Sequence, residues 1–301
     1  MLPLTRRSFL STSAALTAGA ALAGTRAARA IEPIARNGKA KFKFSLAAYS
    51  YRDLLGGMNP KLTMADFVSD CAKFGLEGTE LTSYYFPKNL THDYLHLLAA
   101  QCFRLGLDVS GTAIGNDFGH PPGEKRLKEI ATTKQWIDFA ATLGAPVIRI
   151  FAGHDQPGST PAQAHSLMVS AIEECCEYAG KKGIYLALEN HGGPTATAEG
   201  LLSFVRDVNS PWFGVNLDSG NFASADVYGD LAKIAPYAVN VQVKVVVTND
   251  KKEKSPMDFK KLAALLREAH YRGYIVLEFE EKGDPREECP KYLDQIREAF
   301  A

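Results

Sequence analysis

The sequence has little cysteine and tryptophan and no excess of charge of either sign. Its 301 residues include five cysteines, two tryptophans, and 34 basic against 34 acidic residues. No two cysteines form a CxxC pair, and Cys175 and Cys176 are adjacent, so we expect buried apolar side chains rather than metal ligands or a disulfide framework. Because 46% of the residues are hydrophobic and 23% are charged, the composition is that of an ordinary globular protein and not of a disordered chain.

The even balance of charge hides a basic N-terminus. Residues 1–30 carry four arginines and no acid, so the rest of the chain has 30 basic and 34 acidic residues. Binding of nucleic acid or of an anionic membrane through bulk charge needs a basic excess or a basic stripe. The rest of the chain is slightly acidic, and we expect no nucleic-acid partner.

The first thirty residues resemble an export signal. Residues 5–10 contain two adjacent arginines followed by Phe-Leu, a weakly apolar run follows, and residues 28–30 form a small-x-small cleavage site. The arginine pair resembles the twin-arginine signal, which predicts cleavage after Ala30 and a periplasmic or otherwise exported protein. A membrane anchor is the alternative, but residues 9–24 are few for a spanning helix and rich in Ala, Ser, Thr and Gly. We therefore expect no stable membrane insertion after cleavage.

From residue 41 onward, strand-like runs alternate with amphipathic, helix-like stretches. The eight strand-like runs are residues 42–51, 76–83, 107–114, 146–152, 184–190, 213–218, 239–245 and 274–280. The helix-like stretches include residues 63–74, 92–105, 124–143, 162–182, 199–209 and 257–270. Glycine stands at five of the helix-to-strand joints, where a helix C-cap favours a residue that adopts positive φ.

This alternation predicts an α/β fold with a parallel sheet built from right-handed βαβ units. Eight units in about 240 residues fit a single closed (β/α)8 TIM barrel. An open doubly wound sheet is the alternative, but it predicts a glycine-rich phosphate loop, and the sequence has neither a GxGxxG motif nor a P-loop. We predict a signal peptide at residues 1–30, an N-terminal tether at 31–41 and one barrel domain at 42–301.

Acidic and amide side chains stand where the last four predicted strands end, which is the catalytic end of such barrels. Glu189, Asp218 and Glu278 close apolar runs, and alternation in the seventh run turns Gln242 and Lys244 toward the barrel interior. Buried carboxylates repel one another unless they are paired or bound to a metal. An all-oxygen donor set suits Mn²⁺ or Mg²⁺ better than Zn²⁺. Any one of these acids could equally be a helix cap or a turn residue, but the set of four strand ends favours function.

The set of strand ends resembles the xylose-isomerase-like barrel superfamily of sugar isomerases and epimerases. In that family Glu, Asp, His and Glu at the ends of strands five to eight hold a metal. The segments LALEN, VNLDSGN and VLEFE match three of these positions with Glu189, Asp218 and Glu278. Gln242 in VQVK replaces the usual histidine, and Asn221 replaces a histidine that often follows the aspartate by three residues. The resemblance implies a divalent metal, Mn²⁺ foremost and Mg²⁺ or Co²⁺ as alternatives, held by Glu189, Asp218, Gln242 and Glu278.

The resemblance also implies proton transfer next to the carbonyl of a ketose or keto-glycoside, through an enediolate that the metal stabilises. Glu189 and Glu278 are the expected catalytic pair, one removing the proton and the other returning it. We therefore expect an enzyme, a metal-dependent isomerase or epimerase of small-molecule carbohydrates. A lyase or hydrolase of keto-glycosides at the same site, and a non-catalytic sugar-binding barrel, are the alternatives. Apurinic-site endonucleases share the barrel but need a histidine-rich zinc cluster and a basic face.

Further polar residues are candidates for contacts with the substrate. They are His191, Lys244, Asn221, Arg149, His120, His154 and Glu80. Lys244 either contacts a substrate oxygen or pairs with Glu278 or Glu280, and Arg149 either contacts substrate or is the buried partner of an acid such as Glu80. An aromatic group that includes Tyr49 and Tyr84 follows the first two strands, where part of it could stack on a sugar ring. A homo-oligomer is compatible with the sequence.

Overall fold

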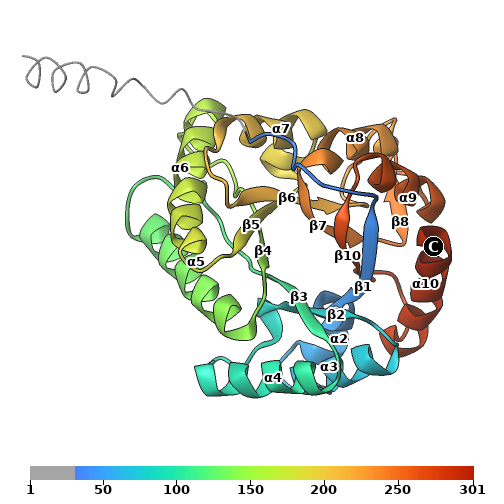
Figure 1. Cartoon of the computed structure of the whole chain (residues 1–301). Coiled ribbons are helices and arrows are strands. Elements are labelled where there is room, and N and C mark those ends of the chain that lie inside the picture. The colour runs from blue at the N-terminus through green and yellow to red at the C-terminus, as the bar shows by residue number, and fades with distance from the viewer. Residues whose placement is uncertain (1–30) are drawn as a thin grey trace, which may run out of the picture.

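Eight parallel strands close into a barrel in the computed structural model, which describes residues 31–301 (Figure 1). Around the barrel the order is β1-β10-β7-β6-β5-β4-β3-β2. The strands are β1 (Lys41–Ala47), β2 (Gly78–Thr82), β3 (Asp108–Ala113), β4 (Val147–Ile150), β5 (Tyr185–Glu189), β6 (Phe213–Asp218), β7 (Ala238–Val243) and β10 (Arg272–Leu277). Each lies within, or overlaps, one of the eight predicted runs, and the predicted (β/α)8 barrel is confirmed. The predicted signal peptide lies outside the described residues.

Helices form a ring outside the strands (Figure 1). They are α3 (Met64–Lys73), α4 (His92–Arg104), α5 (Glu124–Leu143), α6 (Pro161–Gly180), α7 (Ala198–Asp207), α8 (Val227–Ile234), α9 (Phe259–Glu268) and α10 (Pro285–Phe300), with the short α2 (Arg52–Leu55) after β1. Six of them match the predicted helical stretches. The charge-rich α10 was not among those stretches, although it buries Leu293, Ile296 and Phe300 on one face.

Local sequence signals set where these helices begin and end. Thr63 caps α3 by accepting a hydrogen bond from the backbone of Asp66, whose carboxylate accepts from the backbone of Thr63 in return. This reciprocal capping box satisfies backbone donors that the first turn leaves free. At the end of α5, Gly144 adopts a φ of 75°, as the helix-to-strand joints predict. Gly273 differs, because it lies inside β10 and His270 takes the positive φ of that joint, 52°.

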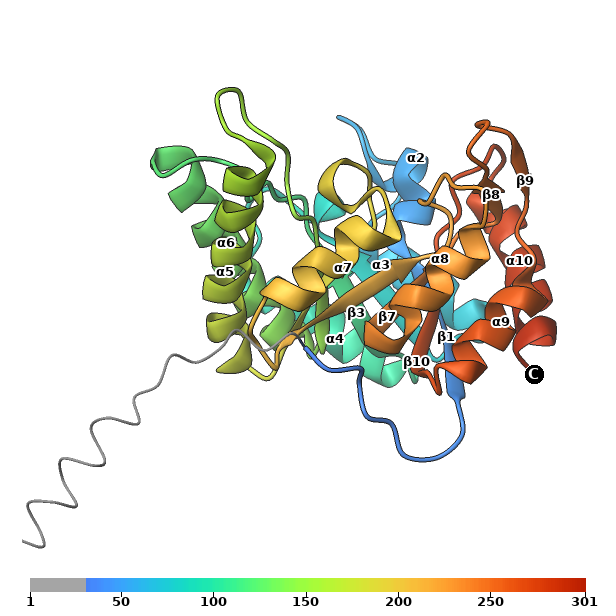
Figure 2. The same cartoon turned by 90° about the horizontal axis from the view of Figure 1, so that it is seen from above.

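The two ends of the barrel carry different structures (Figure 2). The chain before β1 runs under the N-terminal ends of the strands, where the backbone N–H of Ile31 donates to Val205 at 3.1 Å and that of Ile34 donates to Pro236 at 3.0 Å. At the opposite end stands a hairpin of β8 (Val246–Thr248) and β9 (Lys254–Pro256). The N-terminal segment therefore lies at the end of the barrel opposite to the strand C-termini, where the sequence predicts the functional side chains. None of the helices between residues 31 and 301 combines the length and apolarity that crossing a bilayer requires.

The core fills both the barrel and the layer between strands and helices. All five cysteines are buried and free of disulfides, which confirms their prediction as small apolar core residues. The strand interiors are buried on both faces, so polar side chains that point into the barrel need partners there.

Candidate functional site

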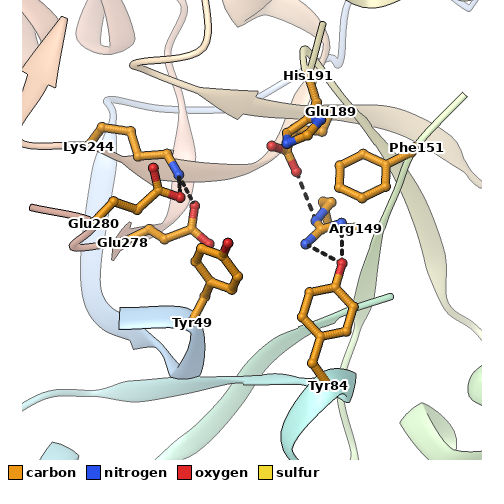
Figure 3. A pocket seen from close by; sticks show the side chains of 9 residues that line it. All are labelled: Tyr49, Tyr84, Arg149, Phe151, Glu189, His191, Lys244, Glu278 and Glu280. Atoms are coloured by element: carbon orange, nitrogen blue, oxygen red, sulfur yellow. Dashed lines mark hydrogen bonds and ion pairs between the residues drawn. The ribbon is translucent and has the colours of Figure 1, made fainter. Parts of the chain in front are cut away.

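A cavity opens at the C-terminal ends of the barrel strands (Figure 3). Its lining residues are Tyr49, Tyr84, Arg149, Phe151, Glu189, His191, Lys244, Glu278 and Glu280. Glu189 ends β5, while Lys244 and Glu278 directly follow β7 and β10. Because strand C-termini converge at one end of a parallel barrel, side chains from distant parts of the chain meet here.

An ion pair between Arg149 and Glu189 forms one side of the cavity. Nε of Arg149 lies 2.8 Å from Oε2 of Glu189, and both side chains are almost fully buried. The guanidinium also packs 4.1 Å from the ring centroid of Phe151, and its Nη1 donates to the carbonyl of Ile114 at 2.9 Å. The other oxygen of the Glu189 carboxylate, Oε1, accepts a hydrogen bond from Nδ2 of Asn221 at 2.8 Å. Glu189 is thus held by one ion pair, to Arg149, and one hydrogen bond, from Asn221.

The environment of this pair shifts both ionisation equilibria. Burial raises the pKa of Glu189 well above its ordinary value, and the nearby carboxylates of Asp218 and Glu278 add to the rise. Burial and the charges of Arg149 and Lys244 lower the pKa of His191, which favours the neutral ring. A carboxyl group whose pKa moves toward neutrality is a better general base at neutral pH. Glu189 is therefore a candidate general base, and it lies beside the permanently charged guanidinium of Arg149.

Lys244 forms the opposite side of the cavity with three carboxylates. Its Nζ donates to Glu278 in a short contact, lies 2.7 Å from Oε1 of Glu280 and lies 3.5 Å from Oδ2 of Asp218. Burial opposes the charged form of Lys244, but these carboxylates outweigh it and raise its pKa well above the ordinary value. Burial also raises the pKa of Asp218, to about 7. The predicted pairing of Lys244 with Glu278 or Glu280 is present with both.

Backbone contacts hold the strand ends in register beneath the cavity. Asn190 donates from Nδ2 to the carbonyl of Asp218 at 2.9 Å and accepts at Oδ1 from the N–H of Asp218 at 2.9 Å. Ser219 accepts from the N–H of Lys244 at 2.9 Å, and Ser50 accepts from the N–H of Phe279 at 2.9 Å. The sequence pattern did not identify these positioning residues. The available signal was a buried amide or hydroxyl next to a predicted functional acid.

A polar network fills the barrel below the cavity. Nε2 of Gln242 donates to Oε1 of Glu80 at 2.6 Å, and Oε1 of Gln242 accepts from Asn216 at 2.7 Å. Asn240 donates both to Glu80 and to Asn216, each at 2.9 Å. All four side chains are buried. Buried polar groups are stable when they are hydrogen-bonded in this way, so the network is part of the structural core of the barrel.

The predicted site residues divide into three groups. The cavity brings together Glu189, Glu278, Lys244, Arg149 and His191, with Asn221 bonded to Glu189 and Asp218 beside Lys244. Gln242 and Glu80 instead face one another in the barrel interior. His120 and His154 do not line the cavity. They lie 3.9 and 3.2 Å from the carboxylate of Asp117, outside the cavity.

Arg149 is the buried partner of an acid, which is one of its two predicted roles. The acid is Glu189 and not Glu80, because Arg149 in β4 is in register with Ala187 of β5, only two residues before Glu189. His154 is largely exposed, and its loop is tied to Asp117 rather than to the cavity. Tyr49 and Tyr84 do line the cavity, as the aromatic group after the first two strands predicts.

The four predicted metal ligands are not assembled around one point. Both ends of the Gln242 amide are engaged in the barrel interior, by Glu80 and by Asn216. The ammonium of Lys244 lies among the carboxylates that would bind a divalent cation, which it would repel. Across residues 31–301, no group of three or more His, Cys, Asp or Glu side chains is placed to hold a metal ion. As arranged, the donors do not fit the predicted Mn²⁺ site, and metal dependence stays a prediction.

Comparison with known proteins agrees with this architecture. A family model described as "Xylose isomerase-like TIM barrel" matches residues 68–299. Similar solved structures include a xylose isomerase domain protein from Planctomyces limnophilus, with 19% identity over 87% of this chain and 98% of that chain and a TM-score of 0.67. A D-psicose 3-epimerase from Clostridium cellulolyticum H10 has 15% identity over 86% and 99%, with a TM-score of 0.72. A 3-keto-D-glucoside 4-epimerase from E. coli has 16% identity over 86% and 100%, with a TM-score of 0.67. No curated protein matches the chain. Identities this low establish the shared fold only.

Proposed function

The chain belongs to the xylose isomerase-like TIM barrel family, and from this membership we propose that it is a carbohydrate isomerase or epimerase. The reaction we propose is proton transfer at a carbon next to the carbonyl of a ketose or keto-glycoside. One observation carries the proposal: Glu189 and Glu278 line a single cavity, each in contact with a buried cation (Figure 3). Sugar epimerases among the structural neighbours support the same reaction class.

The proposed chemistry assigns the proton to the carboxylates. One of Glu189 and Glu278 removes the proton next to the carbonyl, and the carbonyl oxygen gains negative charge as the enediolate forms. Arg149 and Lys244 favour this step because fixed positive charge in a buried site stabilises developing negative charge. The second carboxyl group returns a proton to the other face of the same carbon in an epimerase, or a proton is delivered to the neighbouring carbon in an isomerase. The elevated pKa of Glu189, caused mainly by burial, favours it as the base.

The aromatic side chains of the cavity suit a carbohydrate. Tyr49 and Tyr84 offer apolar ring faces for the C–H side of a sugar and hydroxyl groups for its oxygens. The Arg149 guanidinium lies 3.4–3.5 Å from the Tyr84 hydroxyl, which links the aromatic wall to the cation beside Glu189. A neutral sugar fits this lining better than a sugar phosphate, because the two cations already have carboxylate partners.

Isotope exchange tests the proposal. The purified protein is incubated in heavy water with a panel of ketoses and keto-glycosides, with Mn²⁺ in one arm and EDTA in the other. We expect deuterium to enter at a carbon next to the carbonyl of at least one substrate. E189Q and E278Q are expected to lower the exchange rate at least 100-fold, because each removes a group that moves the proton.

The control variant is E298Q, which changes an exposed glutamate on α10 and should leave the rate unchanged. Absence of exchange on every substrate in both arms would overturn the proposal in favour of a non-catalytic sugar-binding barrel. Release of a leaving group along with exchange would indicate a keto-glycoside lyase or hydrolase instead. The two arms also test the predicted Mn²⁺ dependence, and export through a twin-arginine signal remains a proposal that fractionation of cells would test.

A further inference from the structure

The side chain of Lys244 occupies the centre of the carboxylate cluster at the strand ends. Its ammonium contacts Glu278 and Glu280 and approaches Oδ2 of Asp218, an oxygen that has no hydrogen-bond partner of its own. Lys244 and Asp218 are buried. Carboxylates this close need a positive charge among them, and in this chain the charge comes from a side chain.

The backbone around Lys244 is shaped to hold it there. Its N–H donates to Oγ of Ser219 at 2.9 Å, which ties the end of β7 to the end of β6. The next residue, Gly220, lies directly against the lysine stem, so that a Cβ at this position would stand 2.6 Å from Cγ of Lys244. Only glycine leaves room for the stem to run along this loop. Contacts between the ends of β6 and β7 therefore fix the position of the Lys244 ammonium.

Gln242, two residues before Lys244, is the expected metal donor of this strand, and its side chain is engaged in the barrel interior. The resemblance places Gln242 where the family has a metal-binding histidine, but the Gln242 amide is engaged by Glu80 and Asn216 in the interior. The donor that a metal needs is thus withdrawn, while a cation is placed among the remaining carboxylates. Both features, the interior contacts of Gln242 and the position of the Lys244 ammonium, belong to the C-terminal end of β7. Each of them disfavours binding of a divalent metal.

We propose that Lys244 is the resident cation of this site, in place of the divalent metal that the family's ligand set would hold. Two of its N–H groups are directed to Glu278 and Glu280, and the third is too far from Asp218, at 3.5 Å, for a strong hydrogen bond. That third N–H donates to the carbonyl oxygen of the sugar. The inference rests on the proposed function for this last step only.

In the proposed reaction the electron count closes within the substrate and the two carboxylates. When the C–H bond breaks, its proton passes to a glutamate and its electron pair forms the new carbon–carbon double bond. The carbonyl π pair moves to oxygen, where the Lys244 ammonium stabilises the charge. In an epimerase the second glutamate enters the step protonated, gives its proton to carbon and becomes a carboxylate, while the first glutamate keeps the proton it removed. Proton exchange of both glutamates with solvent resets the pair, so no oxidant, reductant or metal is consumed.

Metal binding tests the inference without reference to activity. The wild-type protein is dialysed against Mn²⁺, and bound metal is measured by mass spectrometry alongside the thermal unfolding midpoint with and without Mn²⁺. We expect less than 0.1 metal per chain and no Mn²⁺-dependent shift. In K244Q the carboxylates lose their cation, and we expect a Mn²⁺-dependent rise of several degrees in the midpoint. K244R keeps a cation and should behave as wild type.

The matched control is K254Q, which removes a neighbouring lysine that contacts Glu281 outside the cluster, at 3.2 Å. It should gain no response to Mn²⁺. Stoichiometric Mn²⁺ in the wild-type protein, or exchange activity that EDTA abolishes, would overturn the inference while leaving the proposed function standing. The opposite combination of results is also possible. If no substrate showed isotope exchange, while the wild-type protein held no metal and K244Q bound Mn²⁺, the proposed function would be refuted and Lys244 would stand as the resident cation. Should K244Q not fold, the wild-type metal content and the EDTA arm decide the question.

Discussion

Gln242 and Glu80 meet inside the barrel although they lie 162 positions apart in the sequence. Nε2 of Gln242 donates to Oε1 of Glu80 at 2.6 Å, and Asn240 donates to the other oxygen at 2.9 Å. Asn216 joins Gln242 and Asn240, so each of the four side chains has at least two contacts within the network. This network directs Gln242 away from the cavity, and it also makes Glu80 a buried acid with a measurable effect on stability.

The first prediction concerns the pH dependence that Glu80 causes. Burial raises the pKa of Glu80 from 4.5 to about 7, although the bonds from Gln242 and Asn240 oppose the rise. Between these two pH values the folded protein holds a proton that the unfolded chain has lost, so the free energy of unfolding falls as the pH rises. In E80Q this contribution is absent. We expect the stability of wild type relative to E80Q to fall by roughly 1–3 kcal/mol between pH 5 and pH 8.

Urea unfolding of both proteins across this pH range is the measurement. E298Q, which changes an exposed glutamate, serves as the control and should run parallel to wild type. If the wild-type and E80Q profiles were also parallel, Glu80 would have an ordinary pKa in the folded state and the assignment would fail.

The second prediction concerns the ion pair of Arg149 and Glu189. In R149M the Glu189 carboxylate loses a partner 2.8 Å away while it remains buried. Leaving one partner of a buried pair uncompensated costs about 3–5 kcal/mol, whereas removing both partners costs less. We expect R149M to lose about this much in the free energy of unfolding, and R149M/E189Q to recover part of it.

Chemical denaturation of the two single variants and the double variant gives the coupling energy. R206M is the control, because Arg206 pairs with Glu199 at the same distance, 2.8 Å, but both side chains are more than half exposed. Exposed pairs contribute about 0–1 kcal/mol, so R206M should be nearly neutral. A cost for R149M no larger than that for R206M would mean that Glu189 is not held as a buried charge.

The third prediction concerns Asn190, which acts through the backbone. Its side chain makes a pair of hydrogen bonds with the N–H and C=O of Asp218 at the end of β6. N190L fills a similar volume but leaves two buried backbone groups without partners, and each such group costs about 1–3 kcal/mol. We expect a loss of roughly 2–4 kcal/mol in unfolding free energy, with a slower exchange reaction because Glu189 is the preceding residue. N209L, at an exposed asparagine, should cost far less. A near-neutral N190L would show that the strand ends hold their register without it.

Alternation and glycine joints are sufficient to predict the barrel because they are local properties of the chain. Strand parity likewise predicts that Gln242 and Lys244 point inward, and both do. Parity does not say which of the other strands an inward side chain reaches. Alternation therefore leaves open which acid Arg149 meets, with Glu80 as one candidate, and its register with β5 brings it to Glu189.

Loops and backbone-directed side chains lie beyond that kind of prediction. The position of His120 in a loop after β3 on the catalytic side predicts a substrate contact, yet His120 lies beside Asp117 outside the cavity. Asn190 and Ser219 contact backbone atoms of the next strand, and no side-chain pattern marks such partners. The contacts that place Lys244 in the cavity and Gln242 in the barrel interior are of this long-range kind, and only the assembled barrel reveals them.

The last prediction concerns Gly220, which leaves space for the stem of Lys244. In G220A the new methyl group would stand 2.6 Å from Cγ of Lys244 and 2.9 Å from the carbonyl of Val246, so the lysine must move. Such overpacking costs about 1–3 kcal/mol, and here it also displaces the ammonium from its carboxylates. G180A is the matched control, because its Cβ would stand 2.3 Å from Trp212 in the outer layer, far from the cavity. We expect both variants to lose stability in thermal unfolding but only G220A to lose isotope exchange, by 10-fold or more. Equal exchange rates in the two variants would mean that the exact position of Lys244 does not matter to the reaction.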